Sequence, residues 1–138
     1  MIRDQLIPAL RESFPTESFI FSEPPQPIAS LPAPYPEIGR LDIYDDGDEA
    51  TVDLTEITHG HFSCYDTDTT TEQREAMITA DVIDFLHALF SDQILLYRTP
   101  TRSMGGWTRL DLSPESERIR RDREYFVWTH PFHNTNDA

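Results

Sequence analysis

The sequence contains no lysine, a single cysteine, only five glycines and no long run of apolar residues. Because Cys64 stands alone, no disulfide can form within the chain, and nothing indicates an oxidising compartment. No stretch approaches the roughly 18 uninterrupted apolar residues that a membrane-spanning helix needs. Residues 1–12 also lack the apolar segment and the small-residue cleavage site of an export signal. We therefore expect a cytoplasmic protein that does not bind membranes.

Positive charge is also scarce. The 138 residues carry 25 acidic and 11 basic side chains, a formal net charge of -14, and this balance disfavours nucleic acids as partners. One basic cluster exists, but acidic residues three or four positions away offset it: Arg118, Arg120, Arg121 and Arg123. Hydrophobic residues make up 38% of the chain and aromatic residues 11%, so we expect a folded core. The length fits a single domain over 1–138.

The first third of the chain predicts a helix, a short strand and a connection. The helix is expected over residues 2–14, with Pro8 as its weak point, because apolar residues recur at helical spacing: Ile2, Leu6, Leu10 and Phe14. Alternation predicts a strand over 17–22. Residues 23–36 contain six prolines, so we expect an extended connection without regular structure there.

The central stretch predicts antiparallel strands. Apolar and polar residues alternate on both sides of an Asp46-Gly47 turn, which is the pattern of a β-hairpin. The same period of two continues over 58–65 and predicts a third strand, in which Gly60 marks a bulge or a turn.

A long helix is the clearest element of the sequence. Thr69 with Glu72, or Thr70 with Gln73, has the spacing of a capping box. An apolar stripe and an acidic face follow; the stripe consists of Ile78, Val82, Phe85 and Leu89, and the acidic face of Glu72, Glu75, Asp81 and Asp84. Beyond it we expect a strand over 93–99, a strand from Trp107, a short helix over 113–123, a strand over 125–128 and a mobile tail over 130–138. The predicted fold class is α+β: a largely antiparallel sheet of hairpins packed by one long amphipathic helix, with short N-terminal and C-terminal helices.

Acidic residues are unevenly distributed along the chain. Residues 37–92 hold 15 acidic and 2 basic side chains, whereas residues 93–138 hold 6 and 7. Solubility alone explains such an excess, but a coherent acidic face would also attract a basic protein surface. Our leading hypothesis is a non-enzymatic protein-binding module that uses Tyr44, Asp45, Asp46, Asp48, Glu49, Asp53 and Glu56. Exposed aromatic side chains would add affinity, with Tyr35, Tyr44, Trp107 and Trp128 as candidates.

Two alternatives stay open. His59 and His61 alternate on a predicted strand, and together with His130 or His133 they would provide enough imidazole ligands for the metal of a metal-dependent enzyme. Asp66 would be its general base. The sequence contains no metal-binding, nucleotide-binding or nucleophile motif, so we expect no cofactor, no bound metal and no catalytic residue. The second alternative is a homo-oligomeric scaffold subunit that pairs through a strand edge.

Four runs of residues carry a family resemblance: 38–49, Thr58-His59-Gly60-His61-Phe62, Val82-Ile83-Asp84-Phe85-Leu86 and Gly105-Gly106-Trp107. They resemble small uncharacterised bacterial cytosolic α+β proteins, and the resemblance implies a bacterial cytosolic domain without an assigned activity. In size and acidity the chain is also similar to bacterial immunity proteins, which neutralise toxin domains by direct binding. This similarity implies an inhibitor or immunity role within the protein-binding hypothesis.

Overall fold

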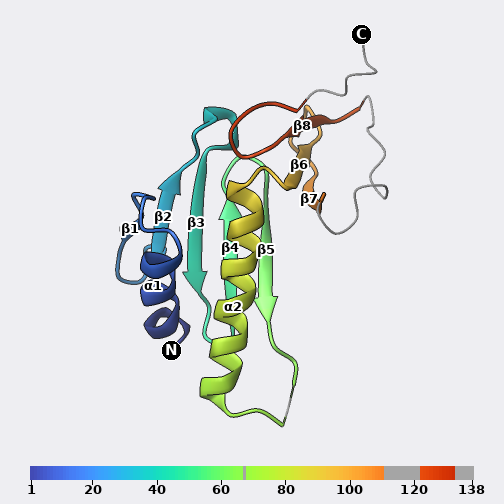
Figure 1. Ribbon diagram of the computed structural model, residues 1–138. Helices are drawn as coiled ribbons and strands as arrows, with labels where there is room; N and C mark the ends of the chain where they lie inside the picture. Colours follow the sequence, from blue (N-terminus) through green and yellow to red (C-terminus); the bar gives the residue numbers. More distant parts are fainter. Residues whose placement is uncertain (67, 111–121, 133–138) are drawn as a thin grey trace.

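The computed structural model describes residues 1–66, 68–110 and 122–132 (Figure 1). Along the chain its elements are α1 (Ile2–Ser13), β1 (Ile20–Phe21), β2 (Ala29–Pro32), the 3-10 helix η1 (Pro36–Ile38), β3 (Arg40–Asp45), β4 (Glu49–Leu54), β5 (Thr58–Ser63), α2 (Thr71–Phe90), β6 (Ile94–Arg98), β7 (Gly105–Arg109) and β8 (Glu124–Phe126). Within these residues, β1 to β5 form an antiparallel sheet in chain order, and β7, β6 and β8 form a second one. The predicted α+β class is confirmed, although the strands divide between two sheets.

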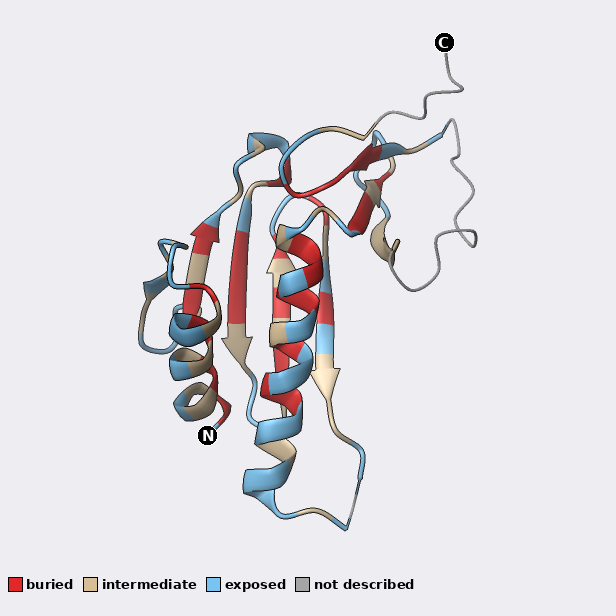
Figure 2. Cartoon of the chain, in the orientation of Figure 1, coloured by how far each residue is buried: buried red, intermediate tan, exposed pale blue. Residues whose placement is uncertain are grey.

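Both helices cover the same face of the larger sheet (Figure 1). Their apolar stripes and the inward side chains of the strands form the core, as the burial pattern in Figure 2 shows. In β4 the alternation is complete: every second residue is buried, and the residues between them are half-exposed. The opposite face of β3, β4 and β5 therefore presents polar side chains away from the helices. No helix among the described residues is long and apolar enough to cross a membrane.

The predicted hairpin is formed by β3 and β4. Gly47 adopts φ +91° in the turn, a conformation that glycine reaches without strain. The Asp45 carboxylate accepts the Gly47 N–H at 2.9 Å, and the Asp46 N–H donates to the Glu49 carbonyl at 2.9 Å. This turn sets the register, in which Tyr44 lies opposite Thr51.

The two helices form where the sequence predicts them. At the start of α2, the Thr70 hydroxyl accepts the Gln73 N–H and the Gln73 side chain accepts the Thr70 N–H, so the capping box is the second of the two proposed. The predicted stripe of α2 is buried against the sheet. Helix α1 continues through Pro8 to Ser13, and its buried residues are Ile2, Leu6 and Leu10.

The proline-rich segment 23–36 does not follow the prediction. Its central residues form β2, which pairs with β3, and the 3-10 helix η1 begins at its last residue, Pro36. A strand is possible because the four residues from Ile28 to Leu31 contain no proline and retain their N–H groups. Ile28, Ala29 and Leu31 are buried, so the segment contributes to the core. The strand predicted over 17–22 shortens to the two residues of β1.

Arg98 joins the two sheets. Its side chain is only 3% exposed, and its guanidinium donates to the carbonyls of Glu37 and Glu56 at 3.2 and 3.0 Å and to the Glu37 carboxylate at 2.9 Å. The same guanidinium lies over the Phe126 ring, 5.0 Å from its centroid. Arg98, a residue of β6 in the smaller sheet, therefore binds Glu37 before β3 and Glu56 after β4 in the larger sheet.

A second link between the sheets is a glycine contact rather than a bulge. Gly60 lies in the regular part of β5, opposite Val52, and a Cβ there would lie 2.2 Å from the Trp107 ring. The missing side chain therefore lets Trp107 of β7 pack onto β5, where it also contacts Phe85 at a centroid distance of 5.4 Å.

The C-terminal predictions are tested only in part. The predicted helix over 113–123 falls mostly outside the described residues, as do Arg118, Arg120, Arg121 and residues 133–138. The final strand, β8, ends two residues earlier than predicted. Residues 130–132 do not belong to a tail: the Val127 N–H donates to the His130 carbonyl at 3.0 Å, and the Phe132 N–H donates to the Tyr125 carbonyl at 2.9 Å.

Candidate functional site

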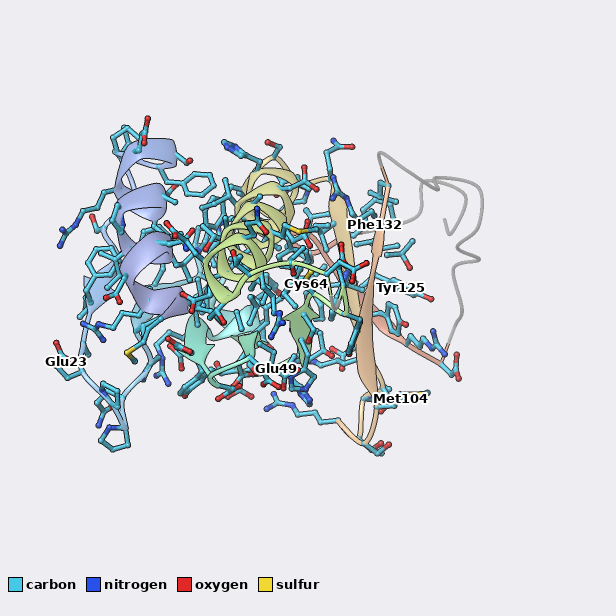
Figure 3. The ribbon with its side chains drawn as sticks, turned by 90° about the horizontal axis from the view of Figure 1, so that it is seen from below. Glu23, Glu49, Cys64, Met104, Tyr125 and Phe132 are labelled. Atoms are coloured by element: carbon cyan, nitrogen blue, oxygen red, sulfur yellow. The ribbon has the colours of Figure 1, made fainter. Side chains whose placement is uncertain are left out.

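The candidate site is the polar face of β3, β4 and β5, which we call the open face. Period-two alternation along the three strands turns these side chains away from α1 and α2, and Figure 3 shows the helices above the strands with Glu49 on the lower side. Its members are Arg40, Asp42, Tyr44, Glu49, Thr51, Asp53, His59, His61 and Ser63.

A pair of aspartates lies at the middle of the open face. Asp42 and Asp53 are directly opposite each other on β3 and β4, and Asp53 in turn lies opposite His59 on β5. Asp42 is buried, and its carboxylate accepts two hydrogen bonds from Arg40 at 2.9 Å and one from the Ser30 hydroxyl at 2.6 Å. A buried carboxylate needs such partners, so Asp42 serves the fold.

Asp53 carries the less compensated charge of this pair. Burial raises the pKa of its carboxyl above the ordinary value, and the neighbouring charge of Asp42 raises it further, while His59 and Arg40 act in the opposite direction. Two like charges directly opposite each other on adjacent strands destabilise a sheet. The open face therefore holds a carboxylate that a cation from outside would stabilise.

Tyr44 is the aromatic side chain of the open face. Burial raises the pKa of its phenol, and the charges of Asp42, Asp53 and Asp46 raise it further, while Arg40 acts in the opposite direction. The other aromatic candidates lie elsewhere. Trp128 is buried in the core, Trp107 packs on β5, and Tyr35 packs against Phe126.

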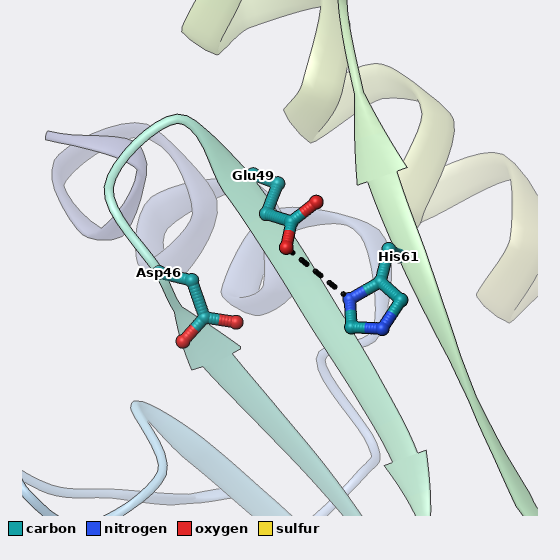
Figure 4. Close-up of side chains that lie close together, drawn as sticks. All are labelled: Asp46, Glu49 and His61. Carbon is teal, nitrogen blue, oxygen red and sulfur yellow. Dashed lines mark ion pairs between the residues drawn. The ribbon is translucent and has the colours of Figure 1, made fainter.

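The hairpin end of the open face brings together two carboxylates and an imidazole (Figure 4). Asp46, Glu49 and His61 each offer one ligand atom, and these atoms lie within 4.8 Å of one another. The distance from Glu49 Oε1 to His61 Nδ1 is 3.4 Å. Two hydroxyls support the cluster: Thr51 donates to Asp46 and lies 3.0 Å from His61 Nδ1, and Ser63 donates to Glu49 at 3.0 Å.

The structure does not gather all the predicted acidic residues on this face. Asp45 points to the helix side, where its carboxylate accepts the Arg3 N–H at 3.1 Å. Glu56 lies beyond β4 and pairs with Arg102 at 2.6 Å. Asp48 is exposed in the hairpin turn. The predicted residues that remain on or beside the open face are Tyr44, Asp46, Asp48, Glu49 and Asp53.

The predicted histidines come together only in part. His59 and His61 share the open face as expected, with ring centroids 5.2 Å apart. His130 instead lies beside Asp92, 4.0 Å from its carboxylate, and His133 is outside the described residues. Among the residues described, no group of three metal-ligating side chains contains His59 or His130. The histidine set of the enzyme alternative is therefore not assembled from the described residues.

Sequence reasoning missed the hydroxyl partners. Thr51 and Ser63 were not singled out, although the Asp-Gly turn fixes the register that places Thr51 between Tyr44 and His61. Counting residues outward from the Asp46-Gly47 turn along the paired strands is the signal that identifies these hydroxyl partners.

No protein-family model, curated protein or solved structure matches this chain.

Proposed function

We propose that this protein is a non-enzymatic binding module whose open face engages a basic surface of another protein. The single observation that carries the proposal is the position of Tyr44 along β3, between the facing pair Asp42 and Asp53 and the turn residue Asp46, on a sheet face that neither helix covers. The proposal keeps the cytoplasmic location and the inhibitor or immunity role that the sequence led us to expect.

Interface physics supports this use of the face. A tyrosine offers a large, rigid contact area together with a polar hydroxyl, and such residues dominate the binding energy at protein interfaces. The ring rests on a sheet, so little conformational freedom is lost when a partner covers it. Tyr44 is the anchor of the proposed interface.

Charge specifies the chemistry of the partner. Asp46, Asp48, Glu49 and Asp53 lie on or beside the open face, and the whole chain has a net charge of -14. Arginine or lysine side chains of a partner would accelerate the encounter and would reduce the repulsion between Asp53 and Asp42. The outer side of α2 is also acidic, but Arg109 already pairs with Asp84 there at 2.6 Å.

The test compares two variants that each lose one negative charge, one on the open face and one on the outer side of α2. Wild-type protein, an open-face variant (Tyr44→Ala with Asp53→Asn) and an α2 control variant (Met77→Ala with Asp81→Asn) are immobilised and exposed to lysate of the source organism. We expect a basic protein to be retained by the wild type and by the α2 control and to be lost from the open-face variant. The purified partner should then bind more weakly as the salt concentration rises from about 50 to about 500 mM, because the electrostatic screening length shortens about threefold over this range.

Two results would overturn the proposal. One is an identical set of retained proteins on the wild type and on the open-face variant. The other is partner binding whose strength does not change over that salt range. Circular dichroism of each variant shows beforehand that the fold is intact.

A further inference from the structure

The cluster at the hairpin end of the open face combines ligand types that the rest of the face does not combine. Asp46 comes from the turn, Glu49 from the start of β4, and His61 from the adjacent strand β5 (Figure 4). Two anionic oxygens and one imidazole nitrogen converge from three backbone positions that the hairpin and its register hold in place. The imidazole distinguishes this cluster from an ordinary patch of surface carboxylates.

The spacing of the ligand atoms suits one shared ion. Protein oxygen and nitrogen ligands lie about 2.0 to 2.2 Å from Zn²⁺, so two ligands of a tetrahedral site are about 3.4 Å apart. Glu49 Oε1 and His61 Nδ1 are separated by 3.4 Å, and the Asp46 oxygen completes a group within 4.8 Å.

The hydroxyls that contact the two carboxylates also resemble the hydrogen-bond partners that surround the ligands of a metal site. Ligating carboxylates are themselves usually hydrogen-bonded, and such partners fix the orientation of the ligand. The Thr51 hydroxyl donates to Asp46, and the Ser63 hydroxyl donates to Glu49 at 3.0 Å. The two carboxylates supply a charge that matches a divalent cation.

We propose that Asp46, Glu49 and His61 bind a divalent first-row transition-metal ion of the zinc class. Mixed oxygen and imidazole donors favour such an ion over Mg²⁺ or Ca²⁺, which take oxygen ligands. Water fills the remaining coordination positions, since Asp46 and His61 are exposed. The site does not depend on the proposed protein partner and is tested without one.

The experiment is a calorimetric titration of the untagged full chain with ZnCl₂ near neutral pH. We expect one ion per chain, with binding weakened at least tenfold in His61→Ala and in Glu49→Gln, because even substitution of a ligand's hydrogen-bond partner weakens metal sites about 10- to 100-fold. The imidazole proton resonances of His61 should shift or broaden on addition of Zn²⁺. CaCl₂ and MgCl₂ should give no saturable binding at the same concentrations.

Three matched controls separate a built site from general attraction of cations. His59→Ala removes a neighbouring imidazole on the same strand, Asp48→Asn removes a neighbouring charge in the same turn, and Cys64→Ser removes the free thiol; each should leave the affinity within about twofold. Asp46→Asn provides a further ligand variant if His61→Ala loses its circular dichroism spectrum. Absence of one-to-one Zn²⁺ binding, or an equal loss of binding in the control and ligand variants, would overturn the proposal.

Discussion

The carboxylate of Asp45, at the end of β3, accepts a hydrogen bond from the backbone N–H of Arg3 at 3.1 Å. Arg3 lies in the first turn of α1, and the N-cap residue Met1 provides no side-chain cap. The first N–H groups of a helix have no partner within the helix, and a negative charge near them also favours the helix dipole. Asp45 therefore caps α1 from a strand 42 positions away in the sequence.

Replacing Asp45 should test this long-range cap. We expect Asp45→Ala to lower the free energy of unfolding by about 1 to 2 kcal/mol, because it removes both the cap of α1 and the hydrogen bond that the Gly47 N–H donates to the same carboxylate. The matched control is Asp48→Ala, because Asp48 is an exposed aspartate of the neighbouring turn. Urea denaturation measures both variants, and equal losses of stability would show that Asp45 does not act as a cap.

Arg98 should be among the most sensitive positions of the fold. Arg98→Met leaves the carbonyls of Glu37 and Glu56 without their donor and removes the contact with Phe126. A buried acceptor left without its donor costs about 1 to 3 kcal/mol, and with two such carbonyls we expect a loss of about 2 to 5 kcal/mol by chemical denaturation.

Arg102 provides the control for Arg98, because it also contacts Glu56. Both side chains of that pair are about half-exposed, at 56% and 45%. Exposed ion pairs contribute about 0 to 1 kcal/mol, so Arg102→Met should cost less than about 1 kcal/mol. If Arg98→Met costs no more than Arg102→Met, Arg98 is not the link between the sheets.

Gly60 should not tolerate a methyl group. A Cβ at this position would lie 2.2 Å from the Trp107 ring, so Gly60→Ala must displace the indole or the strand. Overpacking costs about 1 to 3 kcal/mol. In a Trp107→Leu background the same substitution should cost distinctly less, which a double-mutant cycle measures. An unchanged cost in that background would place the strain elsewhere.

Patterns among residues close in sequence predicted the individual helices and strands of this fold better than they predicted which strands pair with each other. The Thr70 capping box, the apolar stripe of α2 and the Asp-Gly hairpin each depend on residues close in sequence, and all three are confirmed. Strand β2 was missed because its stability comes from pairing with β3, which outweighs the prolines at its ends. The division into two sheets depends on β6 pairing with β8 across a long intervening segment, which no local pattern reveals.

The same distinction applies to the site. Alternation along the strand correctly placed His59 and His61 on one face, whereas the position of Asp53 opposite His59 depends on the pairing of β4 with β5. By that alternation Asp45 belongs with Ile43 on the helix side, so its direction is visible in the sequence, whereas its contact with Arg3 is not. Glu56 is not on the face because β4 ends at Leu54, and its pairing with Arg102, 46 positions later, is not visible in the sequence. Total charge predicted an acidic surface but not which carboxylates the fold itself uses.

Asp53 should lower the stability of the protein when it is ionised. Burial and the charge of Asp42 raise the pKa of the Asp53 carboxyl above its ordinary value of 3.8, so the folded state holds the proton more tightly than the unfolded state does. Stability linked to this group therefore falls as pH rises from the ordinary pKa through the raised one, and the full loss is present at neutral pH. Urea denaturation at pH 7 should therefore give Asp53→Asn a free energy of unfolding about 0.2 to 1 kcal/mol higher than that of the wild type. This difference should vanish below about pH 3.8, because the wild-type carboxyl is then protonated and uncharged as well.

The control is Asp48→Asn, which removes the same charge from the exposed turn. Its stability relative to the wild type should show no such change with pH. An advantage of Asp53→Asn that persists at low pH would assign the gain to packing of the amide rather than to relief of repulsion between Asp42 and Asp53.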